Sequence, residues 1–427
     1  MNIRKLGYNF ISKITSNPVN AFIEEFKLND EEKTVLALKR LHNILEIAKN
    51  HTKFYANFTS FESFPIISKS ILRERYDDFL SNKMNIKDSV IATTSGSSGQ
   101  PMTFYLSKYK KLRQNAEVIF YNRWANIDIG DCHAYVRVTD SKSKLKLFLQ
   151  NQVLMNPKHL TDDWLNKQID FLHRKRIVGI IGHPSAIAAI AQKAREQGFT
   201  QHDFSLKGIV TTGETLKDQD REIMKVAFGV NPISRYSTEE FGVLAASCPQ
   251  CGMFHCNDTG YIIEILKLDE DKPVNIGEPG RVVVTDLFSD HLPLIRFDTG
   301  DIAVYGGNSK CSFYPTGIVL ESVLGRQIET VYDIKGNPIS PFAINGALRD
   351  FNSIKQFQFI QNALDQNILL LVIHHNFGED DINTIKFRFS NLLGNEPEIK
   401  IVDEIPALRS GKRPYIINNY KKNLPET

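Results

Sequence analysis

The sequence predicts an α/β protein, with a large N-terminal domain of layered sheets and helices and a small C-terminal α+β domain. From about residue 91, short β-rich runs alternate with Gly, Ser or Pro turns and helical periodicity, which is typical of strand–helix units around a largely parallel sheet. After about residue 326 the pattern changes to shorter, mixed strands and helices. We therefore predict domains at 1–326 and 327–427.

The first 90 residues are expected to form a helical lead-in to the N-terminal domain, because apolar residues such as Leu38 and Leu41 recur at helical spacing. This lead-in carries no obvious chemistry. Further on, a strand over 177–181 is predicted to lead into a helix that Ser185 caps and that ends before Gly198.

The predicted C-terminal domain consists of alternating short elements. Strands are expected near 329–334, 356–360, 368–374 and 399–402, and helices over 343–351 and 381–393.

Composition favours a small-molecule partner. Among 427 residues, Lys plus Arg number 52 against 49 Asp plus Glu, so no nucleic-acid-coating surface is indicated. No apolar run reaches the length of a membrane span or follows the basic N-terminus as in a signal peptide, so we expect a cytoplasmic protein.

A loop rich in hydroxyl and glycine residues is the strongest local signal. Small residues leave backbone N–H groups uncovered and supply rotatable hydroxyl donors, which suits a loop around a polyphosphate. The spacing differs from a Walker A loop, and composition alone favours a flexible surface loop. The candidate phosphate-binding residues are Thr94, Ser95, Gly96, Ser97, Ser98 and Gly99.

Four further elements follow this loop in order: RYSTEEFG at 235–242, FDTGD at 297–301, Gly325-Arg326 and Ser410-Gly411-Lys412. Together the five elements resemble the motifs of adenylate-forming enzymes, namely acyl-CoA synthetases, luciferases and peptide-synthetase adenylation domains. The short chain, the absence of Lys after Pro101 and the Cys/His cluster that follows 235–242 resemble phenylacetate-CoA ligases and their capsule-biosynthesis relatives most.

The resemblance implies ATP-binding roles for the residues that match these motifs. Asp301 would accept both ribose hydroxyls, Tyr236 would stack on adenine, and Gly213 with Glu214 would line the other side of the base. Arg326 would reach ribose or phosphate at the pivot between the domains.

Two charged residues would carry the chemistry. Glu240 offers oxygen ligands to Mg²⁺, although Glu239 beside it leaves the assignment ambiguous by one position. Lys412 would neutralise charge on the carboxylate and the α-phosphate as pyrophosphate leaves. The sequence departs from the family at Ser237, where the family has glycine, and at the hinge, where Glu329 takes the place of an aspartate.

A cysteine cluster predicts a structural zinc site. Cys248 and Cys251 have zinc-knuckle spacing, and His255 or Cys256 lies close enough to add a third ligand. Cys311 is the candidate for the fourth ligand, since the resembled relatives also carry cysteine there. The alternative is a set of reduced free thiols.

The expected function is ATP-dependent activation of an aryl, acyl or amino acid as its acyl-AMP, followed by transfer to CoA. One alternative keeps adenylation but transfers the acyl group to an amine or a carrier protein in polysaccharide assembly. Another is a nucleotide-binding regulatory protein that has lost catalysis. The sequence leaves the acid and the formation of a homodimer open; scattered pocket residues are expected near 120–124, 183–185 and 211–213.

Overall fold

The computed structural model describes residues 4–8, 17–94, 102–137, 144–157, 160–174, 176–268, 270–326, 331–339, 341–348, 350–351, 353–374, 377–405 and 414–420. Internal packing divides the chain into two compact units, Met1–Thr299 with Ala303–Val323, and Gly300–Ile302 with Leu324–Thr427. The boundary predicted at Arg326 stays a prediction. Among the described residues, no helix is both long and apolar enough to cross a membrane.

The helices of the structure are α2 (Val19–Glu25), α3 (Asp30–His51), α4 (Lys69–Glu74), α5 (Tyr76–Phe79), α6 (Lys108–Trp124), α7 (Lys144–Leu149), α8 (Asp162–Arg174), α9 (Pro184–Glu196), α10 (Asp218–Phe228), α11 (Pro341–Leu348) and α12 (Glu379–Leu393), with short 3₁₀ turns η1 (Phe61–Ser63), η2 (Ile86–Asp88) and η3 (Gln201–Asp203).

The strands in the first half of the chain are β1 (Val90–Thr94), β2 (Met102–Leu106), β3 (His133–Val136), β4 (Gln152–Met155), β5 (Gly179–Gly182), β6 (Gly208–Thr212), β7 (Ile233–Thr238), β8 (Gly242–Ser247) and β9 (Phe254–Cys256). The later strands are β10 (Tyr261–Leu266), β11 (Pro279–Asp286), β12 (Phe297–Asn308), β13 (Ile318–Arg326), β14 (Val331–Tyr332), β15 (Pro338–Ile339), β16 (Ile354–Ala363), β17 (Gln366–Ile373), β18 (Glu398–Ile401) and β19 (Ile416–Asn418).

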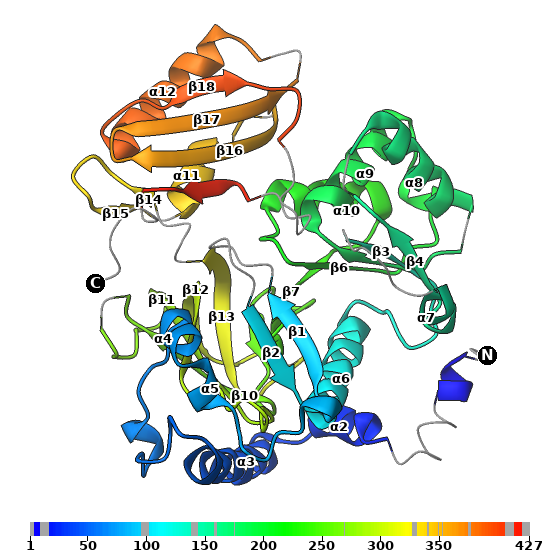
Figure 1. The fold of residues 1–427 in the computed structure, drawn as a ribbon. Helices are drawn as coiled ribbons and strands as arrows, with labels where there is room; N and C mark the ends of the chain where they lie inside the picture. Colours follow the sequence, from blue (N-terminus) through cyan, green and yellow to red (C-terminus); the bar gives the residue numbers. More distant parts are fainter. Residues whose placement is uncertain are drawn as a thin grey trace. The chain divides into compact units, whose positions relative to one another are not determined.

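An 11-stranded sheet in the order β10-β11-β12-β13-β9-β8-β7-β6-β5-β3-β4 organises the first unit (Figure 1). The α/β fold class is confirmed, but the expectation of a largely parallel sheet is wrong. The strands from β3 to β7 pair in parallel, whereas β7–β8, β8–β9, β9–β13 and β10–β11 are antiparallel. The reason is the chain between β7 and β9, which has short connections without the helical crossover that a parallel pair requires.

Helices cover both faces of the parallel part of this sheet. Apolar residues of α8, α9 and α10 pack with β3, β5 and β6 in one cluster that includes Ile169, Ile187 and Met224. On the other face, Tyr121 and Trp124 of α6 pack against Ile181 of β5 and neighbouring strands. Because helices cover both faces of these parallel strands, a ligand is expected to bind at the edge where the carboxyl ends of the strands lie.

The helical lead-in packs against the antiparallel part of the sheet. Asn29 and Glu32 form a reciprocal capping box at the start of α3. The segment before α4 then joins the sheet, because Ile67 donates its N–H to the Arg296 carbonyl oxygen and accepts from the Asp298 N–H. This pairing fixes the start of α4 beside β12.

The helix predicted after β5 is α9, and it begins one residue before Ser185, the expected N-cap. It starts at Pro184 with His183 at the N-cap, so the predicted capping role of Ser185 is wrong. Pro184 decides this boundary, since its fixed φ and missing N–H suit the first helical position. The predicted C-terminal end is close, because Gly198 lies two residues beyond the helix with φ +83°.

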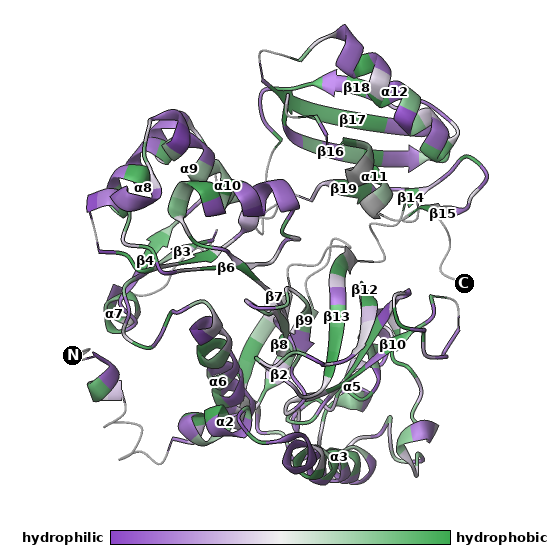
Figure 2. Ribbon diagram, turned by 180° about the vertical axis from the view of Figure 1, so that it is seen from behind, coloured by the Kyte–Doolittle hydropathy of each residue, from purple (hydrophilic) through white to green (hydrophobic). Residues whose placement is uncertain are grey.

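The second unit contains a four-stranded sheet in the order β18-β17-β16-β19. Its core unites Leu369 and Phe359 of the sheet with Ile344 of α11 and Phe389 of α12. Figure 2 shows β17 hydrophobic over most of its length, as expected of an inner strand. The sequence prediction missed β19, a strand of three residues that pairs in parallel with β16.

Candidate active site and metal centre

Several predicted site residues lie outside the described part of the chain. These are Ser95, Gly96, Ser97, Ser98, Gly99 and Lys412. Thr94 is the last residue of β1. The predicted phosphate loop follows it in the sequence, and β2, the next strand after this loop, pairs with β1. Arg326 is the last residue of β13, and the structure describes its backbone alone.

The structure brings the tyrosine motif and the Thr-Gly-Asp motif together. The Tyr236 hydroxyl on β7 lies 3.5 Å from the Thr299 hydroxyl on β12, and Thr299 in turn donates to the Val282 carbonyl oxygen at 2.9 Å. Gly300 has φ +73°, a conformation that glycine adopts without strain. Asp301 follows on β12 and is 8% exposed. Two motifs 63 residues apart thus meet at one place.

The two adjacent glutamates have different surroundings. Glu240, in the turn between β7 and β8, is 2% exposed, and its Oε1 lies 3.8 Å from the Lys69 ammonium. Glu239 is exposed and accepts from Arg137 at 2.9 Å. Glu240 is therefore the glutamate directed into the protein, with one cation beside it.

A buried network behind this turn holds its backbone. Glu117 of α6 accepts from the Val243 N–H at 3.0 Å, and the Tyr261 hydroxyl donates to the Phe241 carbonyl oxygen. Tyr261 also lies within 3.1 Å of Glu117. Burial, and then the nearby carboxylate of Glu117, raises the pKa of Tyr261, so its hydroxyl stays a donor. These hydrogen bonds therefore hold the backbone of Phe241 and Val243, which follow Glu240 in the sequence.

Gly213 and Glu214, the residues predicted to line one side of the adenine, directly follow β6. Gly213 has φ +85° and turns the chain sharply. A Glu214 carboxylate oxygen accepts from the Ser185 N–H at the start of α9, at 3.3 Å. This bond ties the loop after β6 to the loop after β5.

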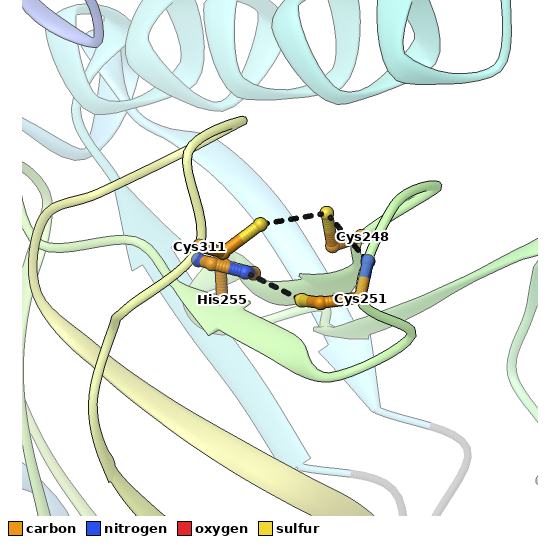
Figure 3. A group of neighbouring side chains, drawn as sticks. All are labelled: Cys248, Cys251, His255 and Cys311. Carbon is orange, nitrogen blue, oxygen red and sulfur yellow. Dashed lines mark hydrogen bonds between the residues drawn. The ribbon is translucent and has the colours of Figure 1, made fainter.

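Four side chains form a cluster with the ligand chemistry of zinc. Cys248 and Cys251 come from the connection between β8 and β9, His255 from β9, and Cys311 from the connection between β12 and β13 (Figure 3). One ligand atom from each lies within 4.8 Å of every other. The Cys248 and Cys311 sulfurs are 3.7 Å apart, and the Cys251 sulfur is 3.3 Å from His255 Nε2. A tetrahedral zinc with bonds of about 2.3 Å to sulfur separates two sulfurs by about 3.8 Å, so the donor set fits this ion.

The alternation of side chains along β9 separates the two candidates for the third ligand. His255 faces the cluster, whereas Cys256 is buried on the opposite face with Leu244 and Leu320. Cys256 is therefore outside the cluster. Burial lowers the pKa of His255 against the opposing influence of Asp258, which favours the neutral imidazole that a metal ligand must be.

Three basic residues near these motifs were missed by the sequence analysis. Lys69 lies in the lead-in, where no chemistry was expected, and only the tertiary structure brings it to Glu240. Arg235 directly precedes Tyr236, and Arg137 directly follows β3, so position next to a motif and at a strand end was the available signal.

The expectation of pocket residues over 120–124 stays a prediction, and the aromatic residues of this stretch pack against other aromatic side chains. Phe120 stacks on Phe26 with ring centroids 4.2 Å apart, and Trp124 packs against Tyr314 and His255. Asn122 of this stretch accepts a hydrogen bond from Arg235 on β7 at 3.2 Å.

Sequence comparison finds relatives for both units. Residues 331–419 match the family model of the CapK C-terminal domain. The chain is 23% identical over 371 residues to Protein CapK of Staphylococcus aureus, covering 84% of this chain and 80% of that protein. It is 24% identical over 168 residues to a phenylacetate-coenzyme A ligase of Thermus thermophilus, covering 39% and 37%.

Solved structures with the same fold include a 2-hydroxyisobutyryl-CoA ligase in the postadenylation state with an acyl-AMP ligand. The TM-score is 0.72 at 19% identity, over 92% of this chain and 90% of that one. The same ligase in an open conformation, bound to 2-HIB-AMP and CoA, gives a TM-score of 0.60 at 19% identity, over 91% of each chain.

Proposed function

Because the chain is homologous to Protein CapK and to a phenylacetate-CoA ligase, and has the fold of adenylate-forming ligases, we propose that it converts a carboxylic acid into its acyl-adenylate with ATP. The observation that carries this proposal is the meeting of Tyr236 with Thr299, two residues before Asp301. It joins the proposed adenine-binding and ribose-binding motifs, with the buried Glu240 in the turn after the same strand.

In the proposed reaction, the substrate carboxylate attacks the α-phosphorus of ATP and pyrophosphate leaves. No general base is required, because a carboxylic acid is already ionised at neutral pH. Asp301 holds the ribose hydroxyls, Tyr236 stacks on the base, and the loop at 94–99 holds the phosphates. Lys412 neutralises the charge that develops during attack. Glu240 supplies oxygen ligands to Mg²⁺, which neutralises phosphate charge when bound.

The acceptor of the acyl group is proposed to be CoA, giving a thioester. The similarity to Protein CapK covers more of the chain than the similarity to the phenylacetate-CoA ligase, which is the reason to test an amine and a carrier protein as well. Supplying each acceptor singly to preformed acyl-AMP, and identifying the product by mass spectrometry, distinguishes them.

The cluster of Cys248, Cys251, His255 and Cys311 is proposed to hold a structural zinc ion. Three thiolates and one imidazole complete four-coordination, as in structural sites, and leave no position for substrate. The metal would link two segments of the chain. One is the loop between β8 and β9, which lies one strand after the Glu240 turn, and the other is the segment before β13.

ATP–pyrophosphate exchange with a panel of carboxylic acids tests the adenylation proposal. We expect exchange that requires both the enzyme and one class of acid, and trapping of the acyl-AMP by hydroxylamine as a hydroxamate. Protein that binds ATP but gives no acid-dependent exchange across the panel would contradict the proposed activity and favour a nucleotide-binding regulatory protein.

A further inference from the structure

Four adjacent parallel strands bring a second group of polar residues to one edge of the sheet. The strand register pairs Val136 with Gly182, Gly182 with Thr211, and Thr212 with Arg235. Arg137 directly follows the first of these positions. The carboxyl ends of β3, β5 and β6 therefore lie beside Arg235, at the edge where ligands of parallel sheets usually bind.

Arg235 and Tyr236 are consecutive on β7, so their side chains leave opposite faces of the sheet. Tyr236 reaches Thr299, whereas Arg235 donates from Nη1 to the Asn122 side chain of α6 at 3.2 Å. Arg235 thus lies on the face away from the proposed adenine site, one residue from it along the strand.

The positive charge of Arg235 is not compensated by the described part of the chain. The Nε atom of Arg235 is buried and has no hydrogen-bond partner among the described residues. No carboxylate of the described residues forms an ion pair with Arg235, and the nearby Glu239 pairs with Arg137. The side chain as a whole is only half-buried, so a ligand can approach it. Burial lowers the pKa of Arg235 against the opposing influence of Tyr135, and repulsion from Arg137 adds to the lowering.

The neighbouring Arg137 has its own partners. It donates to the Tyr135 hydroxyl at 3.2 Å and to Glu239 at 2.9 Å. Glu239 therefore neutralises Arg137 and leaves Arg235 as the uncompensated guanidinium of this edge. A guanidinium matches the planar fork of a carboxylate, which would supply the missing charge and accept from the unpaired Nε.

We propose that the acid activated by this protein is a dicarboxylic acid, whose second carboxylate is bound by Arg235 with Asn122 beside it. This rests on the proposed adenylation. One carboxylate reacts with ATP on the Glu240 side of β7, and the other is held at the Arg235 side chain. Asn122 positions the guanidinium, and Arg235 acts as the specificity-determining residue.

Matched pairs of acids test this assignment by ATP–pyrophosphate exchange. The probes are glutarate, adipate and homophthalate, each against an acid without the second charge: monomethyl glutarate, monomethyl adipate and phenylacetate. For at least one pair we expect the dianion to be preferred about tenfold or more in kcat/KM. Arg235→Gln should abolish that preference by raising KM for the dianion, with rates for the monoanionic partner unchanged within about twofold.

Two further variants guard against a folding defect. Arg235→Lys keeps the charge and should retain part of the preference. Arg221→Gln is the matched control, because Arg221 bonds the Pro232 carbonyl oxygen at the opposite end of β7 and should leave the preference unchanged. If Arg235→Gln does not fold, Asn122→Ala removes the bond to the guanidinium and should reduce the preference.

The outcomes separate the substrate class from the reaction. Exchange with monoanionic acids only, or a dianion preference that Arg235→Gln retains, overturns the dicarboxylate assignment and leaves adenylation standing. If no acid supports exchange, adenylation fails, and calorimetric titration with glutarate, adipate and homophthalate decides the site. Binding that Arg235→Gln abolishes supports the anion site, and absence of binding overturns it.

Discussion

Glu239 and Glu240 are neighbours in the sequence with opposite environments, and this difference predicts different roles. Glu240→Gln should lower pyrophosphate exchange by about 10²-fold, because an amide is a poorer ligand for a cation that neutralises phosphate charge. Glu239→Gln, the matched control, should change exchange by less than about fivefold, since it removes an exposed ion pair. Exchange assays at several Mg²⁺ concentrations compare them. Equal losses in the two variants would place the metal-binding role on neither residue alone.

Asp301 is a single-residue test of the ribose site. Asp301→Ala should weaken ATP binding by roughly tenfold to a hundredfold, because two hydroxyl donors lose a charged acceptor at a buried position. Calorimetric titration with ATP measures the change. Asp298→Ala is the control on the same strand, since Asp298 pairs with Arg281. Unchanged ATP affinity in Asp301→Ala would leave the Thr-Gly-Asp turn a purely structural feature.

Among the secondary-structure elements, α6 supports the turn between β7 and β8. Gly242 begins β8 with φ +114°, and a Cβ atom there would lie 2.4 Å from the Glu117 carboxylate, which is held by Val243 and Tyr261. Glycine is thus required for both its backbone conformation and the space.

Gly242→Ala should therefore destabilise the protein by more than the roughly 1 kcal/mol expected of a strained backbone alone, and should lower exchange by displacing the Glu240 turn. Gly277→Ala is the control, because Gly277 has φ +85° and open space around its Cβ position. Urea unfolding compares the two. A smaller loss in Gly242→Ala than in Gly277→Ala would mean that Glu117 moves aside at little cost.

The connections between strands provide the test of the metal site. Purified protein should contain close to one zinc ion per chain, and Cys248→Ser should lower both the zinc content and the melting temperature, the latter by about 5 °C or more. Mass spectrometry for metal and calorimetry for unfolding measure these. Cys256→Ser is the control, because its sulfur lies outside the cluster and should leave the zinc content unchanged. Zinc-free protein with full stability would identify the cluster as reduced thiols.

At the scale of the whole molecule, the proposed reaction depends on both compact units. Lys412→Ala should lower acyl-adenylate formation by about 10²–10³-fold, because charge develops on the phosphate oxygens in this step. Thioester formation from supplied acyl-AMP should change by less than about twofold, since the thiol attacks the acyl carbon in that step and the α-phosphorus is not attacked. Separate assays of the two half-reactions measure the difference.

Lys400→Ala is the control for this prediction, because Lys400 lies in the same unit and pairs with Glu398 on β18. It should leave both half-reactions unchanged. If Lys412→Ala impairs the two half-reactions equally, Lys412 has a general structural or binding role instead of a role specific to adenylation.

By itself, the sequence determined the α/β class, most of the elements in the second unit with β19 missed, and the resemblance to adenylate-forming enzymes. These follow from local signals, namely hydrophobic period, turn residues and short motifs, which are encoded by neighbours along the chain. It also indicated the residues of the proposed metal site, with His255 and Cys256 as alternatives, because these residues lie close to Cys248 and Cys251 in the sequence and the resemblance supplied Cys311.

Only the tertiary structure decided what depends on distant segments. The antiparallel half of the main sheet, the pairing of Lys69 with Glu240 and the exclusion of Cys256 all result from register and strand alternation across the sheet. Arg235 is another such case, because its lack of a carboxylate partner among the described residues is a property of its surroundings and not of its neighbours in sequence. Local patterns carry no information about such contacts, since the chain must first fold to create them.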